Sequence, residues 1–276
     1  MKMAEELQRE LCSINRKSYP AYKGLKGAYQ FPDYQLFIEH VQGDPFAAPS
    51  ALRIFVPHSK AKFPERYYWD KCSKVALQDA LLRRFAEISA KFCYQAKGSG
   101  KSGVIQVSHC GQEVLERTAC EITKEGIHIR FFVGFPANGR TINSGELEKI
   151  LFVYLPKCVE MSLYHRKVLE RETEQVICLK EDQRVIREEL KKRGLIAFVA
   201  NGSILPRQSG NSDLPMKDAV PFQSPKSMEI TIQLRHRGSI TGMGIRKGIT
   251  LIAGGGYHGK STLLEALEKG VYDHIA

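Results

Sequence analysis

The sequence has no run of about eighteen consecutive apolar residues, the length that a helix needs to cross a membrane. Its start is polar and acidic, whereas a secretory leader is basic and then apolar. It also has no Cys-x-x-Cys pair, and its seven cysteines are odd in number and scattered. We therefore expect a soluble cytoplasmic protein without a membrane partner, whose cysteines are reduced thiols.

Several catalytic and metal-binding patterns are missing as well. The chain has neither His-Glu-x-x-His nor Gly-x-Ser-x-Gly, and its eight histidines show no spacing typical of metal ligands. No block of five or more like charges occurs, and there is no internal repeat or low-complexity tract. These absences argue against a zinc protease, a serine hydrolase of that type and a repeat protein.

The composition is that of a globular protein with a basic bias. The chain has 276 residues, of which 43% are hydrophobic, and 41 Lys and Arg against 30 Asp and Glu give a formal charge of +11. Such a charge favours phosphate-rich partners, either nucleic acid or nucleotides. A solvated basic surface without such a partner is the alternative, because charges of both signs alternate in the densest stretch, residues 164–193.

Hydrophobic periodicity predicts mixed helices and strands along the chain. Apolar residues three or four apart indicate helices, and runs of β-branched and aromatic residues bounded by turn residues indicate strands. The helices are expected near residues 7–14, 77–88, 145–154 and 176–190 and from Lys260 to about Tyr272, and the strands at 34–41, 52–56, 104–107, 127–133, 195–199, 230–234 and 249–253. This pattern predicts an α/β fold.

One segment carries a specific chemical signature. Residues 254–261 read Gly-Gly-Gly-Tyr-His-Gly-Lys-Ser and match the P-loop pattern G-x-x-x-x-G-K-[ST], between an expected strand and an expected helix. In such a loop the backbone N–H groups and the positive end of the helix dipole cradle phosphate. The residues expected to hold the nucleotide are Gly254, Gly255, Gly256, Tyr257, His258, Gly259, Lys260, Ser261 and Thr262.

Within this loop the chemistry assigns distinct roles. Lys260 is expected to reach the β- and γ-phosphates of ATP, the Ser261 hydroxyl to hold Mg²⁺, and Thr262 to support the cradle. His258 either contacts phosphate or faces solvent, and the sequence leaves both open. A second Gly-Lys-Ser at Gly100–Ser102 has Gln95 in place of the first glycine and reversed flanks, so we interpret it as a flexible loop.

A proline-rich and glycine-rich stretch suggests where the chain divides. Residues 203–227 contain four prolines and the sequence Gly210-Asn211-Ser212-Asp213. We expect an N-terminal α/β domain at 1–205, a linker at 206–227 and the beginning of a P-loop nucleotide-binding core at 228–276.

The P-loop and the residues before it resemble a known family, the ATPases of the ABC class. The similarity is carried by residues 242–264 and by five upstream segments: Tyr22–Leu25, His40–Ala47, Gly111–Leu115, Leu195–Val199 and Val220–Pro225. The resemblance implies a family-specific N-terminal domain followed by an ABC-type core that binds ATP and Mg²⁺. It also implies a link to RNA in some relatives, and it leaves a homodimer open for a longer form.

This sequence departs from the pattern in three places. Arg235-His236-Arg237 is more basic than the family leads us to expect, and Tyr257 stands where ABC transporters usually have glycine. Fifteen residues follow Ser261, so we expect the Walker B carboxylates and the signature loop of the family to lie outside this chain.

These observations favour an ATP-binding protein whose hydrolysis machinery is absent from the 276 residues. One rival is a basic RNA-binding module in which the P-loop is structural. Another is a truncated gene model without a function of its own. Salt dependence separates the first two, because backbone binding to nucleic acid weakens steeply as salt rises.

Overall fold

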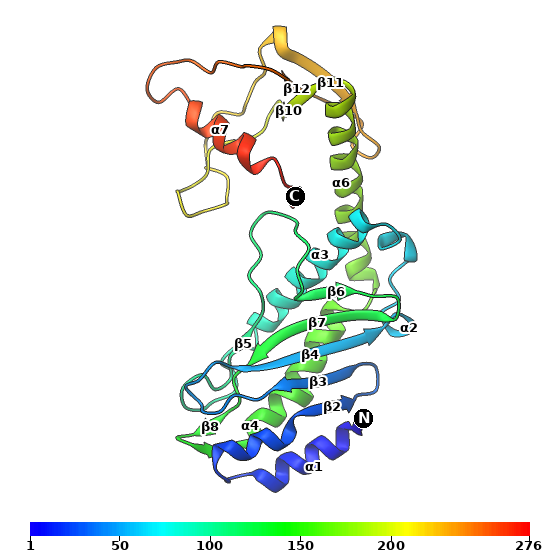
Figure 1. Cartoon of the computed structure of the whole chain (residues 1–276), viewed down its shortest axis with the longest axis vertical. Coiled ribbons are helices and arrows are strands. Elements are labelled where there is room, and N and C mark those ends of the chain that lie inside the picture. Colours follow the sequence, from blue (N-terminus) through cyan, green and yellow to red (C-terminus); the bar gives the residue numbers. More distant parts are fainter. The chain divides into compact units, whose positions relative to one another are not determined.

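The computed structural model describes the backbone of residues 1–276 and all side chains except those of residues 167–169. The chain forms two compact units, which Figure 1 shows in the colours of the sequence. The first unit comprises Met1–Cys110 and Glu116–Thr173, and the second comprises Gly111–Leu115 and Glu174–Ala276. The chain therefore passes between the units more than once.

The first unit is built on a mixed sheet. Its strands follow the order β1-β2-β3-β4-β7-β5, and β6 also pairs with β7. Only the β1–β2 pair is parallel among the pairs of the described sheet. The strands are β1 (Lys2–Met3), β2 (Gly27–Gln30), β3 (Gln35–His40), β4 (Ser50–Pro57), β5 (Ile105–Gln106), β6 (Cys120–Ile122) and β7 (Gly126–Val133).

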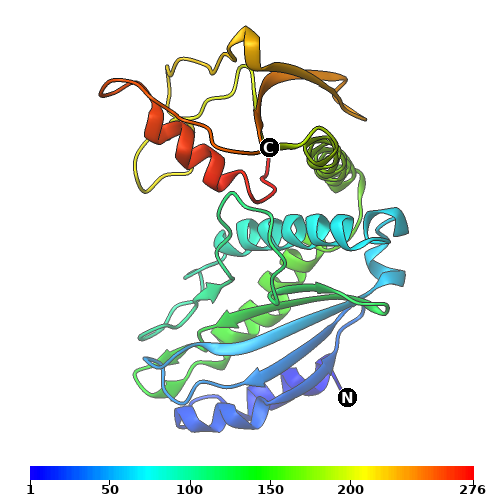
Figure 2. The ribbon, with the colours of Figure 1, turned by 45° about the horizontal axis from the view of Figure 1, so that its top comes forward.

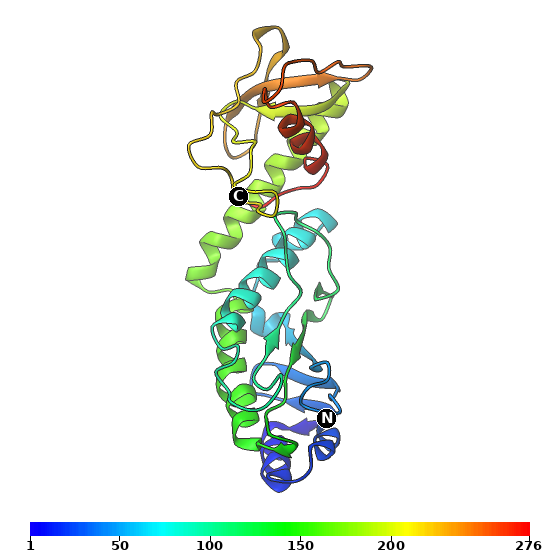
Figure 3. The same cartoon turned by 90° about the vertical axis from the view of Figure 1, so that its left-hand side faces the viewer.

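Helices cover one face of this sheet (Figures 2 and 3). Alternate residues of β4 and β7 are buried there, for example Leu52, Ile54, Ile129 and Phe131, because successive side chains of a strand point to opposite faces. The helical segments of the unit are α1 (Ala4–Ile14), η1 (Tyr19–Leu25), α2 (His58–Ala61), η2 (Glu65–Tyr67), α3 (Lys71–Ala90), α4 (Ser144–Glu148), η3 (Lys149–Tyr154) and α5 (Leu155–Ser162). A short hairpin joins β8 (Ala137–Asn138) and β9 (Thr141–Ile142).

Local sequence explains where the long helix α3 begins and which face it buries. The Asp70 carboxylate accepts a 3.0 Å hydrogen bond from the Ser73 N–H and so caps the first turn. Leu77, Leu81 and Phe85 recur three or four residues apart and are all buried. The predicted helix is thus confirmed, and it starts earlier than its apolar stripe.

The second unit combines a small antiparallel sheet with two helices. The sheet has the order β10-β12-β11, formed by β10 (Leu195–Ala200), β11 (Glu229–Gln233) and β12 (Ser239–Arg246). Helix α6 (Lys167–Lys192) enters this unit and ends before Gly194, whose φ of 64° a glycine adopts easily. A short turn, η4 (Lys226–Met228), precedes β11, and α7 (Lys260–Lys269) follows the P-loop.

The boundary between the units differs from the predicted domain boundary. The units separate at Thr173 and Glu174, upstream of the predicted linker 206–227. Because β10 pairs with β12 on the far side of that linker, residues 203–227 form a loop inside the second unit. The irregular structure expected there is confirmed. In the described chain, the residues from 203 to the start of η4 form no strand or helix, and Arg207 and Pro215 make an isolated bridge.

The strand expected at Ile249–Ala253 is a wrong prediction. These residues are irregular, and Ile249 and Leu251 are 105% and 88% exposed. An extended segment becomes a strand only when a neighbour accepts its backbone hydrogen bonds, and no described strand pairs with this one. Helix α7 is also shorter than predicted, because it ends at Lys269 rather than near Tyr272.

Candidate functional site

The P-loop leads directly into the first turn of α7. Gly259 is the N-cap residue of this helix, and its φ of 76° lies in the left-handed region that glycine tolerates best. Tyr257 has a φ of 61°, which is uncommon for a residue with a side chain. The position therefore suits glycine better than a residue with a side chain.

Four of the predicted residues come together inside the loop. The Gly255 N–H donates a 3.2 Å hydrogen bond to His258 Nδ1, and Lys260 Nζ donates to the Gly255 carbonyl oxygen. A Cβ atom added at Gly254 would lie 3.7 Å from the His258 side chain and 3.8 Å from that of Lys260. The imidazole and the ammonium group thus face the same short stretch of backbone.

The other predicted residues lie around this cluster rather than in it. Ser261 is exposed and Thr262 is half-buried, both in the first turn of α7, where helix N–H groups have no intrahelical acceptor. The Tyr257 side chain is fully exposed to solvent at 109%. The structure therefore groups Gly254, Gly255, His258 and Lys260, and it leaves the Tyr257 side chain in solvent.

Apolar packing holds α7 against the small sheet. Val199 of β10 and Met243 and Ile245 of β12 form a buried cluster, and Leu263 and Leu267 of α7 pack against it. These leucines are four residues apart and share one face of the helix. The P-loop is thus followed directly by a helix that packs against the sheet, although the loop itself is exposed to solvent.

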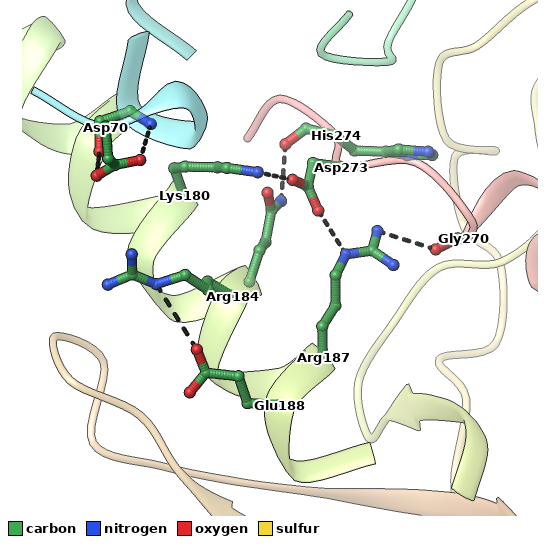
Figure 4. A network of polar contacts seen from close by, with 10 residues as sticks. Asp70, Lys180, Arg184, Arg187, Glu188, Gly270, Asp273 and His274 are labelled. Atoms are coloured by element: carbon green, nitrogen blue, oxygen red, sulfur yellow. Dashed lines mark hydrogen bonds and ion pairs between the residues drawn. The ribbon is translucent and has the colours of Figure 1, made fainter. Parts of the chain in front are cut away.

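A second contact fixes the opposite end of α7, and the sequence analysis missed it. Asp273 lies four residues beyond α7 and accepts hydrogen bonds from Lys180 and Arg187, both on α6 (Figure 4). Arg187 also donates a 3.3 Å hydrogen bond to the Gly270 carbonyl oxygen, and Gln183 donates a 2.8 Å bond to that of His274. No local pattern signals a contact between residues about ninety positions apart.

The Asp273 carboxylate is ionised and mostly shielded from water. Its side chain is 11% exposed, and that of Lys180 is 16% exposed. Burial raises the pKa of this carboxyl, but the hydrogen bonds from Lys180 and Arg187 outweigh burial and hold the pKa below its usual value. The network therefore behaves as a charged clamp between α6 and the chain after α7.

The second Gly-Lys-Ser sequence, at Gly100–Ser102, has a different environment. The Lys101 N–H donates a 2.8 Å hydrogen bond to the Pro45 carbonyl oxygen, and the Ser99 and Gly103 N–H groups donate to Ala137 and Gly134 at 2.7 and 3.0 Å. These N–H groups are bound to backbone carbonyls and do not form an outward anion cradle. The loop is therefore held in place by these bonds, whereas the sequence predicted a flexible loop.

Neither a metal-binding cluster nor a membrane-spanning helix occurs among the described side chains. No group of three or more His, Cys, Asp and Glu residues is arranged to hold a metal ion there. Among the same residues, no helix combines the length and apolar character required to span a bilayer.

Comparison with known families matches two parts of the chain. A family model described as ATPase of the ABC class N-terminal matches residues 4–166, and one described as a P-loop domain matches residues 169–276. The chain belongs to the ABC-class ATPase family. The two matches meet near the start of α6, so the P-loop of this ABC-class ATPase lies in the second matched region together with the Asp273 clamp.

A curated relative of this ABC-class ATPase is the uncharacterized protein MJ1628 of Methanocaldococcus jannaschii. The two are 33% identical over 106 residues, which cover 34% of this chain and 23% of the relative. The match thus spans about a quarter of the relative's length. Membership of the family is shown by the family models, which together cover nearly the whole chain.

Proposed function

We propose that this chain binds ATP together with Mg²⁺ through residues 254–262. The observation that carries the proposal is the convergence of Lys260, His258 and the Gly255 backbone in a loop that opens into the N-terminus of α7. Free helix N–H groups, the helix dipole and an ammonium group together favour a bound polyphosphate.

Binding requires the loop to exchange its present partners for phosphate oxygens. Lys260 Nζ leaves the Gly255 carbonyl and contacts the β- and γ-phosphates, and the Gly255 N–H donates to a phosphate oxygen instead of His258 Nδ1. His258 then lies at the edge of the phosphate site, where its Nδ1 no longer accepts the Gly255 N–H.

The residues present also fit a magnesium ion. Ser261 is exposed on the first turn of α7, and its hydroxyl oxygen is a ligand type that Mg²⁺ accepts beside phosphate oxygens. When bound, the ion neutralises phosphate charge. Hydrolysis lies outside this proposal, because phosphoryl transfer also needs a metal-binding carboxylate and a group that orients water, and we assign neither role to a residue of this chain.

Calorimetric titration with ATP, ADP and AMP tests this proposal. We expect ATP and ADP to bind in the presence of Mg²⁺ and AMP to bind much more weakly, because AMP lacks the β-phosphate that Lys260 contacts. Ser261→Ala should weaken binding of Mg-ATP and leave binding of ATP in chelator largely unchanged. Equal affinity for AMP and ATP would contradict the phosphate-loop assignment.

A second candidate function is binding of single-stranded RNA by the first unit. It is favoured by the sheet face opposite the helices, where Phe37, Arg53 and Arg130 lie in one cross-strand row of β3, β4 and β7. The Arg53 guanidinium lies 3.8 Å from the centre of the Phe37 ring. Phe132, on the same face of β7, is 47% exposed. The aromatic rings suit stacked bases, and RNA phosphates would have to displace Glu39 and Glu121, which pair with Arg53 and Arg130.

Titration with a short single-stranded RNA at low and high salt tests this candidate. Phe132→Ala combined with Arg130→Ala should weaken binding, whereas Lys26→Ala, which removes an exposed charge elsewhere on the unit, serves as the matched control. Binding that falls steeply with salt and depends on the sheet face would support an RNA role. Equal effects of both changes would contradict it.

A further inference from the structure

The segment Gly111–Leu115 belongs to the second unit, although the residues on both sides of it belong to the first. It forms an antiparallel bridge with the chain after α7, through Glu113 and His274. The Val114 N–H donates a 2.8 Å hydrogen bond to the Asp273 carbonyl oxygen, and the Ile275 N–H donates a 3.0 Å bond to that of Gln112. The segment is therefore paired with residues 273–275, which we call the tail.

The Gln112 side chain also holds this segment in the second unit. Its amide nitrogen lies 3.4 Å from Asp213 Oδ1, and its amide oxygen accepts a 3.4 Å hydrogen bond from Arg207. Both partners lie in the long loop between β10 and β11. Backbone and side-chain contacts thus fix the segment at a defined place in the unit that carries the P-loop.

The tail connects this segment to the nucleotide site. Helix α7 has ten residues, so about 15 Å of rigid helix separates the P-loop at its N-terminus from the tail beyond its C-terminus. The Asp273 side chain anchors the same tail to α6 through Lys180 and Arg187. A shift of α7 on phosphate binding would therefore act on the tail, because both α6 and the segment hold the tail.

The chain on both sides of the segment enters one region of the first unit. Strand β5 ends at Gln106, a few residues before the segment, and β6 begins at Cys120, a few residues after it. The chain thus connects the segment covalently to β5 on one side and to β6 on the other, and both strands pair with β7. A displacement of the segment would therefore act on both strands.

We propose that Gly111–Leu115 couples the nucleotide state of the P-loop to the first unit, with the tail as the connecting element. This inference rests on the proposed binding of ATP to residues 254–262. Coupling of this kind is reciprocal: if nucleotide shifts an equilibrium between two states of the first unit by a given factor, those two states differ in nucleotide affinity by the same factor.

Hydrogen exchange measured by mass spectrometry on the full chain tests the coupling. Peptides that cover β5 and β6 are followed without nucleotide and at saturating Mg-ATP, with saturation established separately for each variant. Val114→Pro removes the N–H that donates to Asp273, whereas the matched control Val114→Ala keeps it. We expect ATP to change exchange in β5 and β6 by at least twofold in the wild type and in Val114→Ala, and to leave it unchanged in Val114→Pro.

Each result decides between the two proposals. If the wild type binds ATP but exchange in β5 and β6 does not respond, the coupling is wrong and the binding function stands. If the response persists in Val114→Pro, the tail and segment do not carry it, and the proposal is overturned. If the wild type does not bind ATP at all, both proposals fail together.

Discussion

Replacement of Asp273 removes the carboxylate that joins α6 to the chain after α7. Its pair with Lys180 is mostly buried, with 11% and 16% of the two side chains exposed, whereas Arg187 is 43% exposed. Breaking a buried pair costs about 3–5 kcal/mol when the partner charge stays uncompensated, and a pair with an exposed arginine contributes about 0.2–1 kcal/mol. Lys180 can extend toward water, which lowers the cost of leaving its charge without the Asp273 carboxylate.

We therefore expect Asp273→Ala to lower the free energy of unfolding of the second unit by about 2–4 kcal/mol. This is a large share of the stability of about 5–15 kcal/mol that is typical of a domain. Asp273→Asn, which keeps the shape of the side chain, should cost slightly less, because its amide oxygen can still accept one hydrogen bond.

The two units can be followed separately during urea unfolding. The single tryptophan is Trp69, which lies in the first unit; because its side chain is 71% exposed, its fluorescence reports that unit through a small change on unfolding. Circular dichroism reports the helices of both units, α7 and most of α6 among them. The Asp273→Ala change should shift the part of the dichroism transition that belongs to the second unit and leave the Trp69 transition largely in place.

A double-mutant cycle separates the charge effect from a general packing defect. Lys180→Met removes the second charge and keeps an apolar chain of similar length, so combining it with Asp273→Asn should restore most of the lost stability. If the double variant is as unstable as the sum of the two single variants, or if Asp273→Ala costs less than about 1 kcal/mol, the clamp does not carry the energy assigned to it here.

The remaining predictions concern pH and loop geometry. Because the pKa of Asp273 is lowered in the folded chain, its carboxylate stabilises the fold at neutral pH, and this contribution is lost as pH falls through the folded-state pKa. In urea titrations, the difference in free energy of unfolding between wild type and Asp273→Asn should therefore close below about pH 4. Gly259→Ala places a side chain at a φ of 76° and should weaken ATP binding about tenfold in calorimetry, while binding equal to wild type would refute the strain argument. Tyr257→Gly, at a φ of 61°, should bind ATP at least as tightly as wild type, and a large loss would instead assign Tyr257 a direct contact.

The sequence predicts those elements of this fold that are determined by local pattern. The apolar stripe of α3 and the alternation along β7 are strong periodic signals, and both elements are present where they were expected. The order of strands in the main sheet depends on pairings between distant segments, such as β4 with β7, so periodicity alone cannot give it. The same limit explains the error at Ile249–Ala253, whose apolar pattern is that of a strand although no described strand pairs with it.

The candidate site likewise combines residues that local sequence predicts with contacts that it does not predict. The glycines and Lys260 are recognisable from spacing alone, because the P-loop is a continuous stretch of chain. The contact between His258 and Gly255 is also local, but it depends on the bend that places Tyr257 at positive φ. The clamp at Asp273 and the bridge to Gly111–Leu115 join segments far apart in the sequence, so only the folded chain reveals them.

The central claim is that ATP binds through the P-loop at 254–262, and titration of Mg-ATP into two lysine variants tests it most directly. Lys260 and Lys101 both stand in a Gly-Lys-Ser sequence, but of the two only Lys260 begins a helix. The loop around Lys101 instead donates its N–H groups to the carbonyl oxygens of Pro45, Ala137 and Gly134. The account predicts that Lys260→Ala weakens ATP binding at least a hundredfold and that Lys101→Ala leaves the affinity within about twofold of wild type. Equal loss in both variants, or loss in Lys101→Ala alone, would contradict it.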